Sequence, residues 1–152
     1  MQSQMPYQQQ PYQQQASAMA YVGVWPRALA IIIDGVIIGV IAGIINAITA
    51  AGSIDPGRLA VSGSISGALA FIYFIVLEAT MGATLGKRLL GLRVVKEDGS
   101  AIGWGDSIIR NLLRIIDSLF VYLVGAIIVW NTQRRQRLGD ILAHTVVVRA
   151  RG

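Results

Sequence analysis

A long apolar run interrupted by a single carboxylate constrains this chain more than any other feature. Residues 28–51 contain Asp34 as their only charged side chain. As a helix at about 1.5 Å per residue, the run is roughly 36 Å long, enough for a tilted bilayer crossing. An aspartate at the centre of such a helix is unfavourable by roughly 2.5 to 3.5 kcal/mol. Asp34 is therefore either part of a paired structural network or an ion or proton site.

Two further apolar regions follow. Residues 63–81 contain no ionisable side chain before Glu78 and form a second candidate span. Residues 108–130 differ, because their first half carries three charged side chains: Arg110, Arg114 and Asp117. With 54% apolar and 14% charged residues, the chain is far more apolar than a soluble domain. The sequence predicts an all-α membrane protein with two transmembrane helices and a third apolar helical region.

Signatures of enzymes and cofactor sites are missing from the sequence. There is no cysteine and only one histidine, which leaves no thiolate site and no histidine pair for a metal. Residues 82–88, GATLGKR, differ from a phosphate-binding loop in spacing and in the final residue. We therefore expect no enzymatic activity, no cofactor and no metal site.

The first 20 residues differ in composition from the rest. They carry no charge and repeat PYQQQ at 6–10 and 11–15, without the basic start or apolar core of a signal peptide. The sequence predicts a disordered tail at 1–20, followed by a membrane domain at 21–150.

The basic residues flank the apolar segments, which points to a lipid bilayer as the partner and not to nucleic acid. The loop between the first two spans holds only Asp55 and Arg58 as charges. The next loop and the carboxyl-terminal part are rich in Lys and Arg, and the positive-inside rule places both in the cytoplasm. We therefore expect a multi-pass protein of the bacterial cytoplasmic membrane with a cytoplasmic amino terminus.

Both flanks of the third apolar region are basic, so two topologies are open. In one, residues 106–117 form an amphipathic interfacial helix and residues 119–130 return from a shallow re-entrant turn. In the other, the region is a third span and the basic end lies outside, against the positive-inside rule.

A small cytoplasmic β element is also predicted. Residues 92–95 and 101–104 flank the Asp98-Gly99 turn signal and suit a hairpin. Residues 145–149, TVVVR, read as a third strand that would pair with the hairpin.

Glycines recur every four residues at Gly35, Gly39 and Gly43, and again at Gly63 and Gly67. Such spacing allows close approach of helices in lipid. We expect these faces to pack the two helices or two copies of the chain, with a cavity lining as the alternative.

The intramembrane charges are expected to lie at one depth near the cytoplasmic side. Three arginines, Arg27, Arg110 and Arg114, balance three carboxylates, Asp34, Glu78 and Asp117, one for one. A neutral cluster of this kind is far less costly than a lone charge. Asp34, Glu78 and Asp117 remain the candidates for an ion or proton site.

Two polar features near the carboxyl end have simple interpretations. His144 reads as a loop histidine, with a pH sensor as the alternative. Residues 134–137, RRQR, read as a cluster for anionic headgroups and topology, with phosphate or substrate contact as the alternative.

Taken together, several segments resemble the RDD family of small bacterial membrane proteins. They are Arg27 and Asp34 in the first helix, GATLGKRLLGLRVV at 82–95 with Gly86 and Lys87, RNLLRIID at 110–117, and RRQRLGDILAHTVVV at 134–148. The resemblance implies that Arg27, Asp34 and a second aspartate are the residues that name the family; Asp140 fits best, with Asp117 as the alternative. Many relatives carry a proline after the aspartate of the third region, where this chain reads DSLFVYLVG.

Two functions are consistent with these features. The first is a transporter or transporter subunit, which the resemblance also suggests, exchanging a monovalent cation for protons through Asp34. Two spans cannot enclose a pathway, so this function requires a homo-oligomer or an unknown membrane partner. The second is a non-catalytic membrane scaffold or regulatory module whose buried charges are structural.

Overall fold

Two long apolar helices dominate the computed structural model, which describes residues 19–49, 55–119 and 123–150. They are α2 (Val24–Thr49) and α3 (Pro56–Met81), each 26 residues long and about 39 Å in length. Both are long and apolar enough to cross a membrane, and most of their surface is exposed. This is consistent with a membrane protein. The predicted tail at 1–20 lies almost entirely outside the described residues.

Local sequence signals define both ends of α3. Asp55 is the N-cap, and its side chain accepts a hydrogen bond from the Arg58 N–H, with Pro56 in the first turn. At the other end Gly82 adopts a left-handed conformation with φ 66°, and its N–H donates to the carbonyl of Glu78. The chain therefore turns sharply away from α3.

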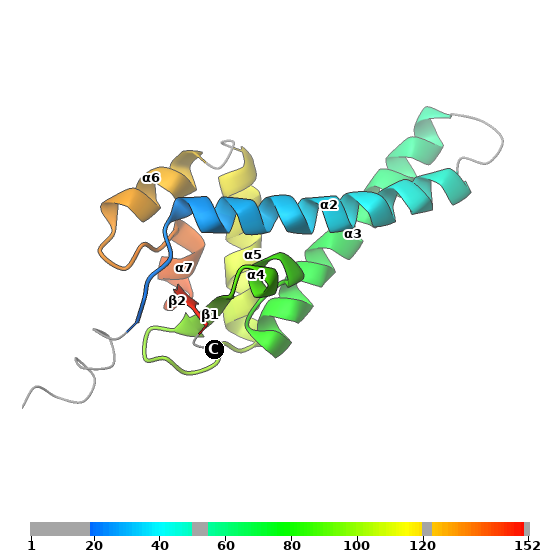
Figure 1. Ribbon diagram of the computed structural model, residues 1–152. Coiled ribbons are helices and arrows are strands. Elements are labelled where there is room, and N and C mark those ends of the chain that lie inside the picture. The colour runs from blue at the N-terminus through cyan, green and yellow to red at the C-terminus, as the bar shows by residue number, and fades with distance from the viewer. Residues whose placement is uncertain (1–18, 50–54, 120–122, 151–152) are drawn as a thin grey trace, which may run out of the picture.

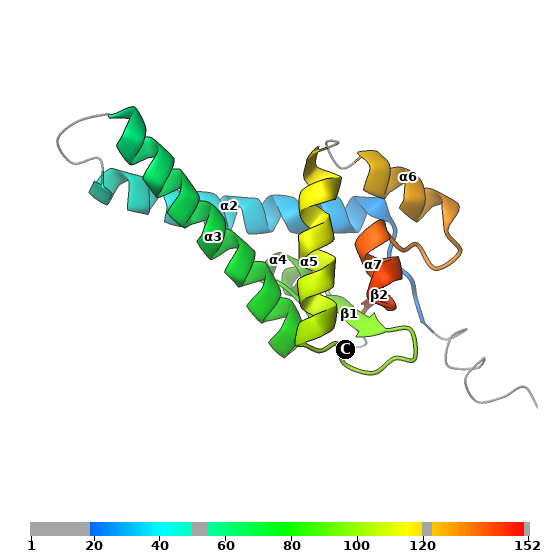
Figure 2. The same ribbon diagram turned by 180° about the vertical axis from the view of Figure 1, so that it is seen from behind.

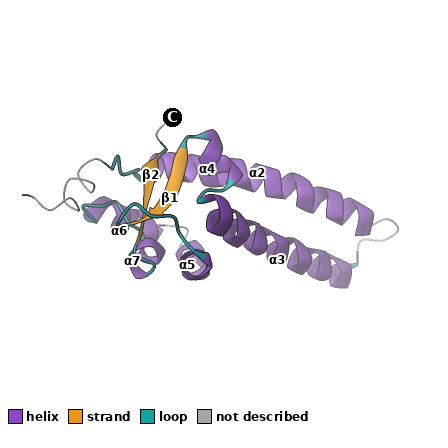
Figure 3. Cartoon of the chain, turned by 90° about the horizontal axis from the view of Figure 1, so that it is seen from below, coloured by secondary structure: helices purple, strands orange, loops and turns teal. Residues whose placement is uncertain are grey.

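The remaining elements form a polar body around the first half of α2. In chain order they are α4 (Leu85–Leu89), β1 (Leu92–Lys96), α5 (Trp104–Leu119), α6 (Leu123–Asn131), α7 (Leu138–Leu142) and β2 (Thr145–Arg149). Helix α4 packs on α2, α5 on α3, and α7 on α5. The far half of α2 and the start of α3 extend beyond this body (Figure 1 and, from behind, Figure 2). From below, α2 and α3 run alongside each other, with the sheet at one end (Figure 3).

The sheet joins segments from both ends of the chain. Strands β1 and β2 are antiparallel, with Leu92 opposite Arg149 and Lys96 opposite Thr145. The strand at 145–149 is thus confirmed. The expected second hairpin arm at 101–104 is wrong: only Ala101 makes an isolated bridge to β1, and α5 already begins at Trp104. On the other edge Tyr21 bridges to β2, so the start of the described chain covers it.

The third apolar region folds as two separate helices. The amphipathic helix expected at 106–117 is confirmed within α5, which has 16 residues. Helix α6 has only nine residues, which is too short to cross a bilayer. The chain between them, residues 120–122, lies outside the described part.

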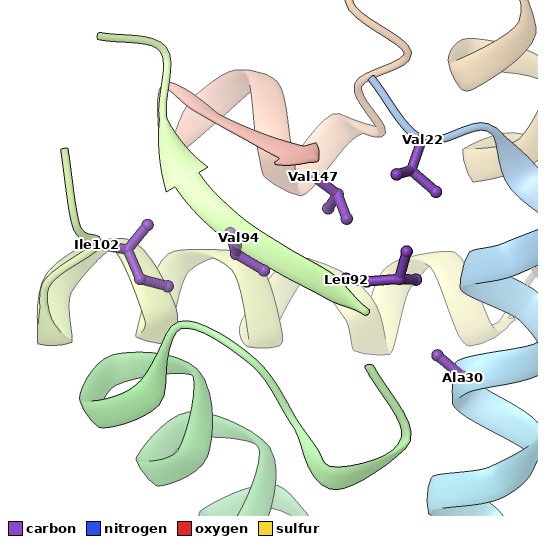
Figure 4. Close-up of a cluster of buried hydrophobic side chains, with 6 residues drawn as sticks. All are labelled: Val22, Ala30, Leu92, Val94, Ile102 and Val147. Atoms are coloured by element: carbon purple, nitrogen blue, oxygen red, sulfur yellow. The ribbon is translucent and has the colours of Figure 1, made fainter. Parts of the chain in front are cut away.

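A small apolar core lies beneath the sheet. It combines Val22, Ala30, Leu92, Val94, Ile102 and Val147 (Figure 4). Adjacent valines are buried in each strand, Val94 with Val95 and Val146 with Val147, so both faces of the sheet are covered there. This core fixes β1 and β2 against the first turns of α2 and so positions the charged groups around them.

The expectation that the glycine faces pack α2 against α3 is wrong. A methyl group built on Gly35, Gly39, Gly43, Gly63 or Gly67 would meet no heavy atom within 4 Å, and all five residues are exposed. Other residues connect the two helices at their far ends, where the Ser62 hydroxyl donates to the Asn46 side chain. The glycine faces point away from the chain itself.

Candidate functional site

Much of the buried charge in the described residues gathers around Asp140 of α7. Asp140 is fully buried, and three arginines from different segments bind it. Arg27 Nη1 donates to Oδ2 at 2.5 Å, and Arg137 Nε donates to Oδ1 at 3.3 Å. Arg110 of α5 donates from Nη1 to the same Oδ1. One carboxylate therefore ties α2 and α5 to the carboxyl-terminal segment.

Arg110 connects Asp140 to a second buried carboxylate, Glu78, near the end of α3. Its Nε donates to Glu78 Oε2 at 3.1 Å. Lys87 of α4 forms an ion pair with Glu78 Oε1, and Asn111 Nδ2 donates to Oε2 at 3.4 Å. We call the connected set Arg27, Glu78, Lys87, Arg110, Arg137 and Asp140 the charge network.

Neutral groups satisfy the remaining donors of two arginines in this network. Arg27 Nε donates to the Val22 carbonyl at 3.1 Å, and Arg27 Nη2 donates to the Arg135 carbonyl at 2.7 Å. Arg110 Nη1 also donates to the Thr145 hydroxyl at 2.6 Å. Such additional hydrogen bonds help to make buried charge tolerable.

Asp34 lies outside the charge network and is held by neutral donors. It is fully buried, and its Oδ1 accepts hydrogen bonds from the Tyr73 hydroxyl and the Gly86 N–H, both at 2.8 Å. Its Oδ2 accepts from the Thr84 hydroxyl at 2.6 Å. No ion pair to Asp34 occurs within the described ranges 19–49, 55–119 and 123–150.

Helix α4 joins the two carboxylate sites through consecutive residues. Gly86 gives its backbone N–H to Asp34, and the next residue, Lys87, reaches Glu78. Gly86 is required there because an added Cβ would collide with the backbone carbonyl of Ala30 and lie 3.0 Å from the Asp34 carboxylate. Thr84 caps the helix by accepting from the Lys87 N–H at 3.4 Å.

Arg114 and Asp117, farther along α5, face different surroundings. Arg114 lies over the Phe74 ring, 3.9 Å from its centroid, and donates to Asn111 Oδ1 at 3.3 Å. The Asp117 carboxylate lies against Gly125 and lines a pocket between α2 and α6. We find no hydrogen bond or ion pair to this carboxylate in the part of the chain that the structure describes.

The expected set of three arginines and three carboxylates is incomplete. Asp140 joins it and binds Arg27, because β2 and α7 bring Asp140 to the first turn of α2. The described site buries four carboxylates, and five cations surround them once Lys87 and Arg137 are included. Within the expected set, Arg110 and Glu78 form an ion pair.

Burial and neighbouring charges shift the pKa values of several groups outside the long helices. Burial and nearby arginines lower the pKa of Lys87 to about 7, against the opposing effect of Glu78. Burial alone would raise the pKa of Asp140, but Arg110, Arg27 and Arg137 hold it well below its usual value. Burial raises the pKa of Asp117. Deprotonation of Lys87 would leave four cations for four carboxylates.

Sequence reasoning missed the neutral partners of the site. They are Tyr73, Thr84, Asn111 and Thr145. Tyr73 carried one usable signal, since it is a phenol five residues before Glu78 in an apolar helix, where its hydroxyl needs a partner. The others are ordinary polar residues that only the fold brings to the carboxylates.

The two polar features near the carboxyl end lie in different settings. His144 is exposed, with φ 49°, just before β2. Of the 134–137 cluster, Arg134 pairs with Glu97 at 2.6 Å and Arg137 belongs to the charge network. Part of this cluster is therefore structural.

The described residues hold no group of three or more His, Cys, Asp or Glu side chains that could bind a metal ion. The acidic residues of the site are engaged by arginine, lysine or hydroxyl groups, apart from Asp117. What the arrangement offers chemically is charge pairing and, beside a pocket, one carboxylate that receives no hydrogen bond from the described residues and interacts with Arg137 and Arg114 through charge alone.

Comparisons with known proteins match this architecture to one family. The RDD family model covers residues 21–144, which span every residue of the charge network. The uncharacterized protein YxaI of Bacillus subtilis (strain 168) is 30% identical over 146 residues, covering 83% of this chain and 95% of that protein. The proline-rich antigen homologs of Mycobacterium tuberculosis strains CDC 1551 / Oshkosh and ATCC 25618 / H37Rv are 35% identical over 72 residues.

The mycobacterial matches cover 47% of this chain and only 30% of those longer proteins. No solved structure matches the chain. The family match spans most of the sequence and includes Arg27, Asp34 and Asp140, so the chain belongs to the RDD family.

Proposed function

We propose that this RDD protein is a non-catalytic scaffold or regulatory module of the cytoplasmic membrane. In this proposal α2 and α3 cross the bilayer, and the polar body presents a docking surface to a protein partner. The observation that carries the proposal is the charge network, in which two buried carboxylates are fully engaged by four cations. These ion pairs hold elements together, and they leave no free carboxylate oxygen in the network for a transported cation.

The pairing of distant strands supports a cytoplasmic polar body and a non-spanning third region. Strand β1 precedes α5 and β2 follows α7, yet the two strands share one sheet. Both ends of the segment from 97 to 144 are therefore on the same side of a membrane. The basic residues around β1 and in 134–137 favour the cytoplasm as that side. The chain at Tyr21 would lie on the same side of the membrane, because Tyr21 bridges to β2.

The scaffold proposal is tested by separating folding from transport. Purified protein in proteoliposomes with a pH-sensitive dye should show no cation-dependent proton flux, whereas Asp140→Asn should unfold at lower temperature. Asp106→Asn serves as the matched control, because Asp106 is a partly exposed carboxylate at the start of α5. Crosslinking in native membranes should then recover the same partner under several growth conditions. Proton flux in the wild type, or no recovered partner, would contradict the proposal.

A second candidate is monovalent cation/proton exchange through Asp34. One observation favours it: the described residues offer Asp34 three neutral donors and no cation, although it lies in an apolar helix. A proton or cation would supply the missing compensation. Such a pathway requires a homo-oligomer or a partner subunit. Sodium, potassium or lithium should then drive proton movement that Asp34→Asn abolishes while the protein stays folded.

A further inference from the structure

A pocket of about 320 Å³ lies between α2 and α6. Helix α6 lies beside the first turns of α2 (Figure 2). Most of the lining is apolar, from α2 on one side and from α6 on the other. Three ionisable side chains are part of the lining: Arg27, Asp117 and Arg137.

Two of these ionisable groups have bonding capacity left over. Asp117 is only 2% exposed, lines the pocket and has no hydrogen bond or ion pair among the described residues. Arg137 binds Asp140 through Nε, but its Nη2 is buried without a hydrogen-bond partner. Arg27 is fully engaged. The pocket therefore offers one carboxylate acceptor and one guanidinium donor, both buried.

A buried polar group without a hydrogen-bond partner lowers the stability of a fold. A ligand that forms hydrogen bonds with both Asp117 and Arg137 would remove this cost and would be bound for that reason. The complementary ligand carries a hydrogen-bond-donating cation for Asp117 and an anionic oxygen for Arg137. A primary ammonium separated by a short linker from a phosphate meets both requirements. A quaternary ammonium does not, because it has no N–H to donate.

The surroundings of the pocket favour a lipid as the source of this headgroup. Ile32 lines the pocket and is 61% exposed, so the apolar wall continues onto the outer face of α2. That face carries Val36 and Val40 at helical spacing, a path for an acyl chain. Trp25 and Trp130 are exposed next to lining residues Val24 and Val129, and tryptophan concentrates at the headgroup level of membranes.

We propose that this pocket is a binding site for an aminophospholipid such as phosphatidylethanolamine, with the ammonium on Asp117, the phosphate on Arg137 and an acyl chain along α2. The site depends on the membrane location of α2 but not on the docking role proposed above. It would exist equally in a scaffold and in a transporter.

Native mass spectrometry of the delipidated full-length protein in detergent tests this site. Phosphatidylethanolamine, phosphatidylglycerol and phosphatidylcholine of identical acyl chains are added separately. The wild type should bind phosphatidylethanolamine about tenfold more tightly than the other two, and Asp117→Asn should lose this preference. Asp106→Asn, which alters a carboxylate on the same helix outside the pocket, should keep it. Equal binding of the three lipids, or a preference that survives Asp117→Asn, would overturn the proposal.

One further variant and one competition experiment keep the result interpretable. Ala126→Leu places extra bulk in the pocket without touching its charges, so it should weaken phosphatidylethanolamine binding even if Asp117→Asn fails to fold. Water-soluble phosphoethanolamine should compete only weakly, because it lacks the acyl chains. If it bound as tightly as the lipid, the site would belong to a soluble zwitterion and the lipid assignment would fall.

Discussion

At the scale of single residues, we expect substitution of Asp140 to lower the stability of the protein most. It is the only described carboxylate bound by three arginines, and two of these come from helices far from it in sequence. The sequence indicated six of the residues that carry buried charge but not Lys87 or Arg137, and the family resemblance singled out Arg27, Asp34 and Asp140. It did not indicate which charges pair, because pairing across more than 100 residues depends on where β2 and α7 fold back.

Asp140→Asn should destabilise the protein by roughly 3–5 kcal/mol, because Arg27 would keep its buried charge without a counter-charge and Arg110 would keep only Glu78. Thermal unfolding in detergent measures the loss. Asp106→Asn should change the unfolding temperature little, since its pair with Lys96 is half-exposed. An Asp140→Asn protein as stable as wild type would show that the network is not structural.

Lys87 should give the stability an unusual pH dependence. Its folded pKa is about 7, below the ordinary 10.5, so between these values the unfolded chain binds more protons. Stability should therefore rise with pH across this window, by up to about 1.4 kcal/mol per pH unit. Melting temperatures at pH 7, 8 and 9 measure the slope, which Lys87→Met should flatten and the exposed Lys96→Met should not. A wild-type slope of the opposite sign would refute this.

At the scale of elements, α4 is short but connects the parts of the site. Within its five residues, the Gly86 N–H donates a hydrogen bond to Asp34 and the Lys87 side chain forms an ion pair with Glu78. The long helices, α5 and β2 were all predictable, because apolar runs, amphipathic spacing and valine-rich strands are local signals. Helix α4 and the missing hairpin arm were not, since they depend on the close approach of Gly86 to α2 and on the early start of α5.

Gly86→Ala should destabilise the protein by about 1–3 kcal/mol, because the new methyl group would push α4 away from the Ala30 carbonyl and break the Gly86–Asp34 hydrogen bond. Gly105→Ala is the matched control. A methyl group there meets nothing within 4 Å, so greater helix propensity should leave stability equal or slightly higher. Chemical unfolding in detergent compares the two; equal effects would argue against tight packing at α4.

At the scale of the whole molecule, one polar body gathers segments that the two long helices separate along the sequence. Tyr21, β1 and β2 meet in one sheet, so their compartment must be the same. The positive-inside pattern favours that arrangement, but hydrophobicity alone could not choose between a re-entrant region and a third span. The strand pairing bears on that choice, because β1 lies before the third apolar region and β2 after it, and their pairing could not be read from either segment alone.

Single cysteines can test this topology, since the natural sequence has none. Ser100→Cys and Gln133→Cys lie on exposed parts of the polar body, whereas Arg58→Cys lies at the opposite end of α3. A membrane-impermeant maleimide applied to intact spheroplasts should label only the Arg58→Cys protein, and lysis should make the other two reactive. Labelling of Gln133→Cys from outside would establish a third crossing.

The closing of the sheet by β2 also sets an order of events during synthesis. Arg27 leaves the ribosome more than 100 residues before Asp140, its partner, so α2 and α3 are made while the charge of Arg27 has no counter-ion. Until α7 and β2 are available, the newly made chain must keep the Arg27 guanidinium in contact with water or with the insertion machinery. A segment translated long after both long helices thus supplies the counter-charge for the start of α2.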